Sequence, residues 1–390
     1  MRFIGPTCYL ALSMLISGSI TIGMAFVTNA RQLIIVRFFL GVAEAGYFAG
    51  IITYFSLWYC KKEQTMRMAI LCAAVPAAGG IDGILTYGIS HMQGIGGLNS
   101  WQWTFLLEGL PIIPLGVLVY VLLDKIPNAV QWLSNIEKQL LTNLLRDDTG
   151  VADSEPIPKT RISWRQVRYV FIDWQIYLYS MIAGGILAAL KSLITLLPTL
   201  FETTGYTKTE THLMTTLPYA VACVCALLVG YSSSHRNEHG YHLLFCLSIA
   251  LLGFILMFTL SNQGKVVMCI SSTVSCCGVL SALSLPLSWL TNNIGGHTKR
   301  SMAISFVMGI GQIGGICMPL IYRDVDKPTY RRGHAICSGL IAVSMAATII
   351  LLICLMKENN RRTNLSPEEY TREATIKEPC DRHPDVRYSL

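Results

Sequence analysis

Charged residues are scarce in this 390-residue chain: Asp, Glu, Lys and Arg together make up 14% of it, whereas apolar residues make up 52%. The mean hydropathy is +0.49. A chain with so little charge and so much apolar surface is too hydrophobic to fold as an ordinary soluble domain. The composition therefore indicates an integral membrane protein whose main solvent is the lipid bilayer.

The sequence also lacks the motifs that carry common catalytic or metal chemistry. Its 13 cysteines form no CxxC pair, and no histidine lies at metal-ligand spacing from them. Many lie in apolar runs, such as the adjacent Cys276 and Cys277, where cysteine usually acts as a small apolar side chain. The loops show no nucleophile beside a base and no phosphate-binding loop. We therefore expect no cofactor and no metal, and an enzyme is a minor alternative.

The net charge of +7 does not indicate nucleic-acid binding, because the basic residues follow a membrane topology. With the N-terminus placed in the cytoplasm, the predicted internal segments hold roughly three times as many Lys and Arg residues as the external loops. This bias predicts that both termini are cytoplasmic. The expected location is the plasma membrane.

Ten apolar runs are long enough to cross a bilayer core about 30 Å thick. Because backbone groups in lipid must be satisfied within the spanning segment, each run is expected to be a helix. The runs are Tyr9–Val27, Leu33–Tyr59, Met68–His91, Thr104–Leu123, Trp174–Leu200, Thr211–Tyr231, Leu243–Leu260, Val266–Leu290, Met302–Tyr322 and Ala335–Met356. The predicted fold class is an all-α membrane protein with ten transmembrane helices.

Polar stretches divide these helices into groups. Residues 124–173 form a cytoplasmic linker after four helices, and apolar residues at near-helical spacing in 131–146 predict an amphipathic surface helix there. The polar tail 357–390 is expected to be cytoplasmic and disordered. The resulting division has an N-terminal bundle at 1–123, the linker, a C-terminal bundle at 174–356 and the tail.

Four charged residues, Arg37, Glu44, Asp82 and Lys191, lie where a membrane span has hydrocarbon around it, which costs roughly 2.5–3.5 kcal/mol each on insertion scales. Arg37 and Glu44 share one helix face, about 10 Å of helix rise apart. Asp82 and Lys191 lie about 14 Å inside the ends of their runs. We expect these four residues to line a substrate or proton pathway, although a lysine can also snorkel to the surface.

Glycines and a carboxylate near these charges suggest packing and interfacial roles. Gly41 shares the face of Arg37, while Gly46 and Gly50 form a small-xxx-small pair on another face, where a second helix can approach. Glu108 lies one turn inside its predicted span. It is either an interfacial carboxylate or a functional one.

Several motifs together resemble the fungal allantoate permease family, the anion:cation symporter branch of the major facilitator superfamily. They include RFFLGVAEAG at 37–46, WTFLLEG at 103–109, PTLFETTGY at 198–206 and WLTNNIGGHTKR at 289–300. The motif residues singled out are Gly41, Gly46, Trp103, Glu108, Asn293, Lys299 and Arg300. That family has twelve helices in two bundles of six. The resemblance therefore implies an incomplete N-terminal bundle of four, lacking the first two helices, and a complete C-terminal bundle of six.

The resemblance also implies a function: proton-coupled symport of a small organic anion, such as a ureide or a vitamin-like carboxylate, by alternating access. Glu44 would bind and release the proton, Arg37 would hold Glu44 or a substrate carboxylate, and Lys191 would supply positive charge from the second bundle. Asp82 and Lys191 belong to no motif of the family. The alternative is a truncated, non-transporting membrane protein that is inactive or associates with full-length carriers.

Overall fold

The computed structural model describes residues 4–124, 132–149, 163–203, 207–260, 264–322, 326–327, 329–375 and 380–390. The regular elements in these ranges are all helical. Ten segments among the described residues are long and apolar enough to cross a membrane. The predicted all-α class and the ten predicted spans are therefore confirmed.

The chain divides into two compact units that alternate along the sequence, and one boundary between them falls within helix α4 (Lys61–Ser90), after Ile84. Unit 1 comprises Met1–Cys60, Leu85–Asp148 and Pro156–Ile162, and unit 2 comprises Lys61–Ile84, Thr149–Glu155 and Ser163–Leu390. Most of the third predicted span thus groups with the second unit. The four-part division drawn from the sequence stays a prediction.

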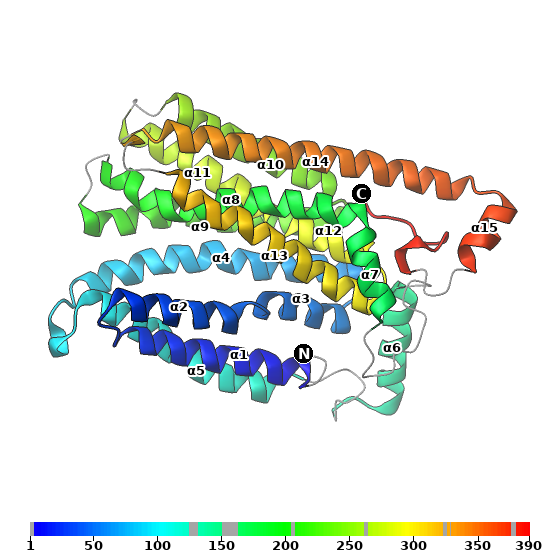
Figure 1. Ribbon diagram of the computed structural model, residues 1–390, viewed down its shortest axis with the longest axis horizontal. Helices are drawn as coiled ribbons and strands as arrows, with labels where there is room; N and C mark the ends of the chain where they lie inside the picture. Colours follow the sequence, from blue (N-terminus) through cyan, green and yellow to red (C-terminus); the bar gives the residue numbers. More distant parts are fainter. Residues whose placement is uncertain are drawn as a thin grey trace. The chain divides into compact units, whose positions relative to one another are not determined.

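The helices follow the chain in order (Figure 1). Those lying wholly or mainly in unit 1 are α1 (Pro6–Met24), α2 (Ala30–Glu44), α3 (Tyr47–Trp58), the short 3-10 helix η1 (Ile95–Gly97), α5 (Ser100–Leu122) and α6 (Asn135–Thr149). Those lying wholly or mainly in unit 2 are α4 (Lys61–Ser90), α7 (Trp164–Ile172), α8 (Trp174–Thr203), α9 (Lys208–Arg236), α10 (Gly240–Thr259), α11 (Lys265–Ala282), α12 (Leu285–Asn293), α13 (His297–Ile321), α14 (Arg331–Thr363), α15 (Pro367–Ala374) and the 3-10 turn η5 (Cys380–Arg382).

In unit 1, α1 and α5 pack along a seam of small residues. A Cβ atom at Gly109 would lie 2.7 Å from Ile22 Cγ1, and one at Gly18 would lie 3.0 Å from Ile112. Only glycine lets the two helices approach this closely. Lipid tails are as apolar as the side chains, so such close packing, and not the hydrophobic effect, holds membrane helices together.

The predicted span Leu33–Tyr59 is two helices, because α2 ends at Glu44 and α3 begins at Tyr47. A Cβ at Gly46, in the break, would overlap the Tyr9 hydroxyl, so Gly46 is a packing position. A Cβ at Gly41 would meet nothing within 4 Å, and α2 has no buried residue. The α2 face that carries Arg37 and Gly41 is therefore exposed among the described residues of unit 1.

In unit 2, α8 packs against α13 and α14 in the same glycine-dependent way. A Cβ at Gly314 would lie 2.5 Å from the Gly184 carbonyl oxygen, and one at Gly185 would overlap the Ser344 hydroxyl of α14. The predicted span Val266–Leu290 is broken between α11 and α12. Pro286 follows this break as one of the first residues of α12, where its missing N–H costs no intrahelical bond.

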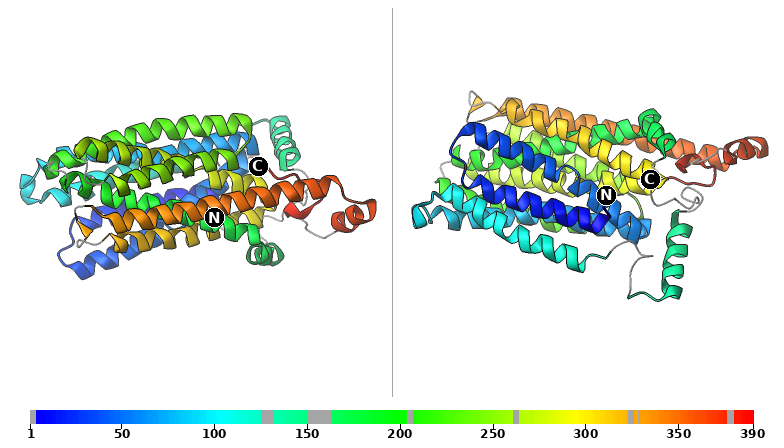
Figure 2. Two further views of the ribbon diagram at one scale, coloured as in Figure 1. Left: turned by 90° about the horizontal axis from the view of Figure 1, so that it is seen from above. Right: turned by 60° about the horizontal axis from the view of Figure 1, so that its bottom comes forward.

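The polar regions are more ordered than the sequence predicts. The amphipathic helix expected in the linker is present as α6, beginning at Asn135, but α7 was not predicted. The expected disorder after Met356 is wrong for 357–375 and 380–390: α14 continues to Thr363, α15 follows, and segment 380–390 returns toward α12 (Figures 1 and 2). Composition alone predicted disorder because these residues are polar, but several of their polar groups bond to other helices of unit 2.

The α8–α13 seam generates a stability prediction. Gly314→Ala should lower the apparent melting temperature of the purified protein in detergent, because the added methyl group must displace the α8 backbone, at about 1–3 kcal/mol. Gly309→Ala, on the same helix, is the matched control, since a Cβ there would meet nothing within 4 Å. Equal melting temperatures for the two variants would contradict the seam.

Candidate functional site

Lys299 lies in the first turn of α13 and is 1% exposed. Its Nζ contacts Asp173 Oδ2 and Asp381 Oδ1, both at 2.6 Å. Asp173 lies between α7 and α8, and Asp381 comes from segment 380–390. A buried ammonium group is stable only when its charge is compensated and its protons are hydrogen-bonded. This site meets that requirement with two carboxylates.

Asn293, the last residue of α12, is 2% exposed and has a fully bonded side-chain amide. Its Nδ2 donates to Tyr179 Oη at 3.2 Å and to the Ser389 carbonyl oxygen at 3.1 Å. Its Oδ1 accepts from the Ser389 backbone N–H at 2.8 Å and from the Ser389 hydroxyl at 3.1 Å. We call Asp173, Tyr179, Asn293, Lys299 and Asp381 the Lys299 cluster.

The turn between α12 and α13 is fixed by backbone and side-chain bonds. Arg300, 4% exposed, donates Nε to the Ile294 carbonyl oxygen at 3.0 Å. Gln166 Oε1 of α7 accepts from the backbone N–H groups of Thr298 and Lys299 at 3.1 and 3.3 Å, which satisfies donors that a helix N-terminus leaves without intrahelical partners. Arg300 therefore acts in the structure of this turn.

His239 lies at the start of α10 and is fully buried. Its Nε2 is 3.1 Å from both Thr65 Oγ1 of α4 and Asn292 Nδ2 of α12. Burial, with a smaller contribution from His242, lowers the pKa of His239 from its ordinary value of 6.5 to about 4. The ring is therefore neutral at physiological pH.

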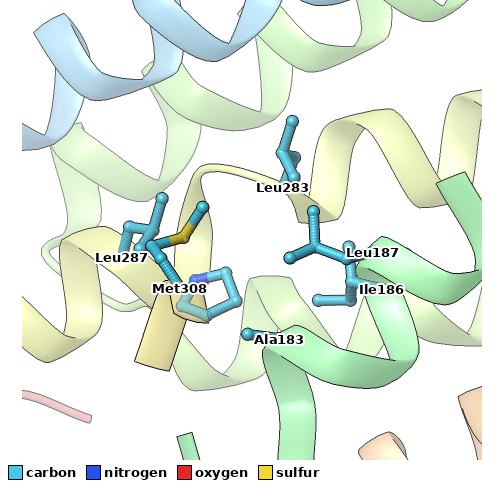
Figure 3. Close-up of a pocket in the computed structure, with 7 residues that line it drawn as sticks. Ala183, Ile186, Leu187, Leu283, Leu287 and Met308 are labelled. Atoms are coloured by element: carbon cyan, nitrogen blue, oxygen red, sulfur yellow. The ribbon is translucent and has the colours of Figure 1, made fainter. Parts of the chain in front are cut away.

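Lys191 is exposed on α8. A Cβ at Gly315 of α13 would lie 3.0 Å from Lys191 Cγ, so the lysine stem rests against a helix that has no side chain at that point. Leu187 lies one turn earlier and Ala183 two turns earlier on the same face of α8. Both line a small apolar pocket at the break between α11 and α12, together with Ile186, Leu283, Pro286, Leu287 and Met308 (Figure 3).

Asp82 is exposed on α4, beside the seam that α4 makes with α9. A Cβ at Gly79 would lie 3.2 Å from the Tyr219 ring, and one at Gly83 would lie 2.7 Å from the Thr216 hydroxyl. Both glycines are thus covered by α9. Asp82 lies between them in sequence but stays accessible.

The remaining sequence-predicted residues lie in unit 1. Arg37 and Glu44 are exposed on α2, and the Arg37 guanidinium lies 5.8 Å from the centre of the Phe105 ring of α5. Trp103 donates Nε1 to the Ile95 carbonyl oxygen at 3.1 Å and so attaches the loop before α5 to that helix. Glu108 is exposed on α5.

The structure therefore brings two of the predicted residues, Asn293 and Lys299, into one cluster. Sequence reasoning missed Asp173, Tyr179 and Asp381, which complete it. The position of Asp173 directly before a span was a weak signal. Asp381 had none, because it lies in a polar tail far from Lys299 in sequence.

A sequence model of the Major Facilitator Superfamily matches residues 2–319. The chain belongs to this superfamily. Similar proteins include the MFS transporter prlL of Fungal sp. (strain NRRL 50135), 29% identical over 90% of this chain and 70% of the relative, and the MFS-type transporter cnsO of Penicillium expansum, 28% identical over 97% and 74%. This major facilitator is therefore a multi-span membrane transporter and not an enzyme.

Solved structures support the same fold. The proton:xylose symporter XylE matches this major facilitator with a TM-score of 0.68 at 13% identity, over 91% of this chain and 80% of that one. The human organic anion transporter MFSD10 matches with a TM-score of 0.59 at 12% identity, over 89% and 78%. At these identities the likeness shows the fold alone.

The buried His239 makes the stability of this major facilitator pH-dependent. Its folded pKa of about 4 lies below its ordinary 6.5, so its stabilising contribution is complete above about pH 6.5 and is lost as pH falls toward 4, by up to about 3 kcal/mol. Melting temperatures measured across this window should fall less for His239→Gln than for the unchanged protein. The exposed His235→Gln is the control, and it should keep the full pH dependence.

Proposed function

We propose that the protein is a proton-coupled symporter of a small organic anion, of the allantoate permease branch, working by alternating access in the plasma membrane with both termini in the cytoplasm. The observation that carries the proposal is Lys191. Charged residues within spans generally face a cavity or a partner and mark substrate or ion pathways. Lys191 is exposed well inside α8 and is braced against Gly315.

The surroundings of Lys191 favour a particular kind of anion. Lys191 follows Leu187 by one helical turn, and Leu187 lines the apolar pocket at the α11–α12 break. A small carboxylate whose charge pairs with the exposed Lys191 ammonium group suits this position. Nicotinate, pantothenate and allantoate all carry such a carboxylate, on bodies that differ in polarity, and so serve as probes.

For the coupling proton we propose Glu44, with Arg37 on the same helix as the group that orients it or a substrate carboxylate. Glu44 ends α2 at the break before α3, and its position within an apolar run motivates the role. XylE is a proton:xylose symporter and MFSD10 is an organic anion transporter. The shared fold is compatible with both activities.

A second candidate is a chain that does not transport alone and associates with other carriers. The observation favouring it is that α2 has no buried residue within the part of the chain that the structure describes, so this helix offers an exposed surface to another protein. Uptake by this chain expressed alone separates the two candidates.

The first functional prediction concerns Lys191. In yeast lacking endogenous uptake of radiolabelled nicotinate, pantothenate and allantoate, the chain should restore uptake of at least one probe. Lys191→Gln should reduce that uptake about tenfold or more, because one charge-assisted hydrogen bond is lost, and Lys191→Arg should retain part of it. Lys62→Gln, an exposed lysine at the start of α4, is the control. Equal uptake by Lys191→Gln and Lys62→Gln would remove Lys191 from the site.

The second functional prediction concerns Glu44. Uptake by the unchanged chain should rise as external pH falls, and Glu44→Gln should abolish this dependence, because an amide cannot bind and release the coupling proton. Glu108→Gln, which replaces an exposed carboxylate on α5, should keep it. Uptake that ignores pH in the unchanged chain contradicts proton coupling, and absence of uptake for all three probes favours the second candidate.

A further inference from the structure

We infer that segment 380–390 is a releasable latch, a peptide that docks on the end of unit 2 where α12 meets α13 and holds that end in one arrangement. The segment runs back from α15 to this end of the bundle in every view (Figures 1 and 2). It has little regular structure beyond the 3-10 turn at Cys380–Arg382. Its order therefore depends on what it binds.

The first anchor is electrostatic. Asp381, 1% exposed, places Oδ1 2.6 Å from Lys299 Nζ. Beside it, Cys380 Sγ would lie 2.7 Å from a Cβ at Gly296, a turn residue with φ +87° that favours glycine. The start of the segment thus lies directly against the α12–α13 turn.

The second anchor is a set of hydrogen bonds at the other end of the segment. Ser389 exchanges bonds with the Asn293 amide through its backbone and hydroxyl, and its carbonyl oxygen also accepts from Trp289 Nε1 at 2.8 Å. The Leu390 carbonyl oxygen accepts from the His239 backbone N–H at 2.7 Å. The segment therefore links α12 to the start of α10.

The third anchor is α14. Arg362, 6% exposed, stacks over the Tyr388 ring at 4.5 Å and donates to Tyr388 Oη at 3.0 Å and to the Val386 carbonyl oxygen at 2.8 Å. The Asn359 side-chain amide donates Nδ2 to the Tyr388 carbonyl oxygen at 2.8 Å and accepts at Oδ1 from the Tyr388 backbone N–H at 2.9 Å. The segment is thus held on both sides, by α14 and by the α12–α13 end.

The charge balance makes the latch releasable. If the segment leaves, Lys299 keeps Asp173 at 2.6 Å and remains a neutral pair, whereas Asp381 moves into water. Asn293 keeps its bond to Tyr179. Removing one partner of a buried pair is strongly destabilising when the other charge is left alone. Arg362 likewise keeps Glu358 Oε1 at 2.9 Å on α14, so no charge in the docking surface is left alone, and the docked and released states differ by one ion pair and the hydrogen bonds of the three anchors.

The expected consequence is control over the α12–α13 turn, which the segment covers at Gly296 and Asn293 while it also binds α14 and α10. Docking keeps these helix ends together, and release frees the turn to rearrange. An effect on uptake rests on the proposed transport function, whereas docking itself does not. The two are therefore tested by separate measurements.

The test is hydrogen exchange of the full-length protein in lipid nanodiscs, followed by mass spectrometry. Asp381→Asn should accelerate amide exchange in 380–390 about tenfold or more, because a charge-assisted bond is lost, and should accelerate exchange in 294–300 as well. Exchange within α10 and α14 should not change. Asp385→Asn is the matched control, since this nearby carboxylate is 52% exposed and accepts from Tyr370 at 3.1 Å, away from Lys299.

Two results overturn the latch: unchanged exchange in 380–390 for Asp381→Asn, or faster exchange that extends to α10 and α14, which would make the segment an inseparable part of the fold. If Asp381→Asn does not fold, Tyr388→Phe provides the second variant, because it removes the hydroxyl between Arg362 and Asp381 without a change of charge. The same exchange pattern is expected for it. A latch confirmed by exchange in a chain without uptake refutes the transport proposal alone.

Discussion

The positive charge of Lys299 needs negative partners, because its side chain is only 1% exposed at the start of α13. Two carboxylates provide the compensation, one preceding α8 and one from the segment after α15. A buried charge that binds two partners fixes their relative positions, since moving either one away from the ammonium weakens a desolvated ion pair. The same arrangement also allows the hydrogen bond from the Asn293 amide to Tyr179 and the bond from the backbone of α13 to Gln166.

Away from this charged end, unit 2 is held by shape. Gly314 and Gly185 let α8 touch α13 and α14 at backbone distance, and in lipid such close contact replaces the hydrophobic effect as the main source of association. The two mechanisms divide the length of α8. The ion pair of Asp173 with Lys299 fixes the position of the start of α8, and the glycine contacts fix the position of its middle. Lys191 lies on the same helix and remains exposed.

Much of this fold was predictable from the sequence because hydrophobicity and backbone satisfaction decide where membrane helices form. The helix breaks at Gly46 and before Pro286 were not predictable, because the length of an apolar run does not show which glycine or proline packs against a neighbouring helix. The contact of the Tyr9 hydroxyl at Gly46 depends on the tertiary structure. The ordered tail was mispredicted for a related reason. Composition predicts whether a segment can bury apolar surface, and segment 380–390 is held instead by hydrogen bonds and a charge supplied by distant residues such as Arg362 and Lys299.

The two lysines of unit 2 show why residue type and depth alone do not define a site. Lys299 belongs to one of the motifs that carry the family resemblance, and it has a structural role. Its ammonium group contacts the Asp173 and Asp381 carboxylates, both at 2.6 Å, which leaves it little capacity to bind a ligand. Lys191 belongs to no such motif, yet it is exposed beside Gly315, one turn beyond the apolar pocket. A charge already compensated by the protein stabilises one conformation, whereas an accessible charge inside a span can gain its compensation from a substrate. The physical difference between these two positions is the reason to seek substrate recognition on α8 and conformational control at the α12–α13 turn.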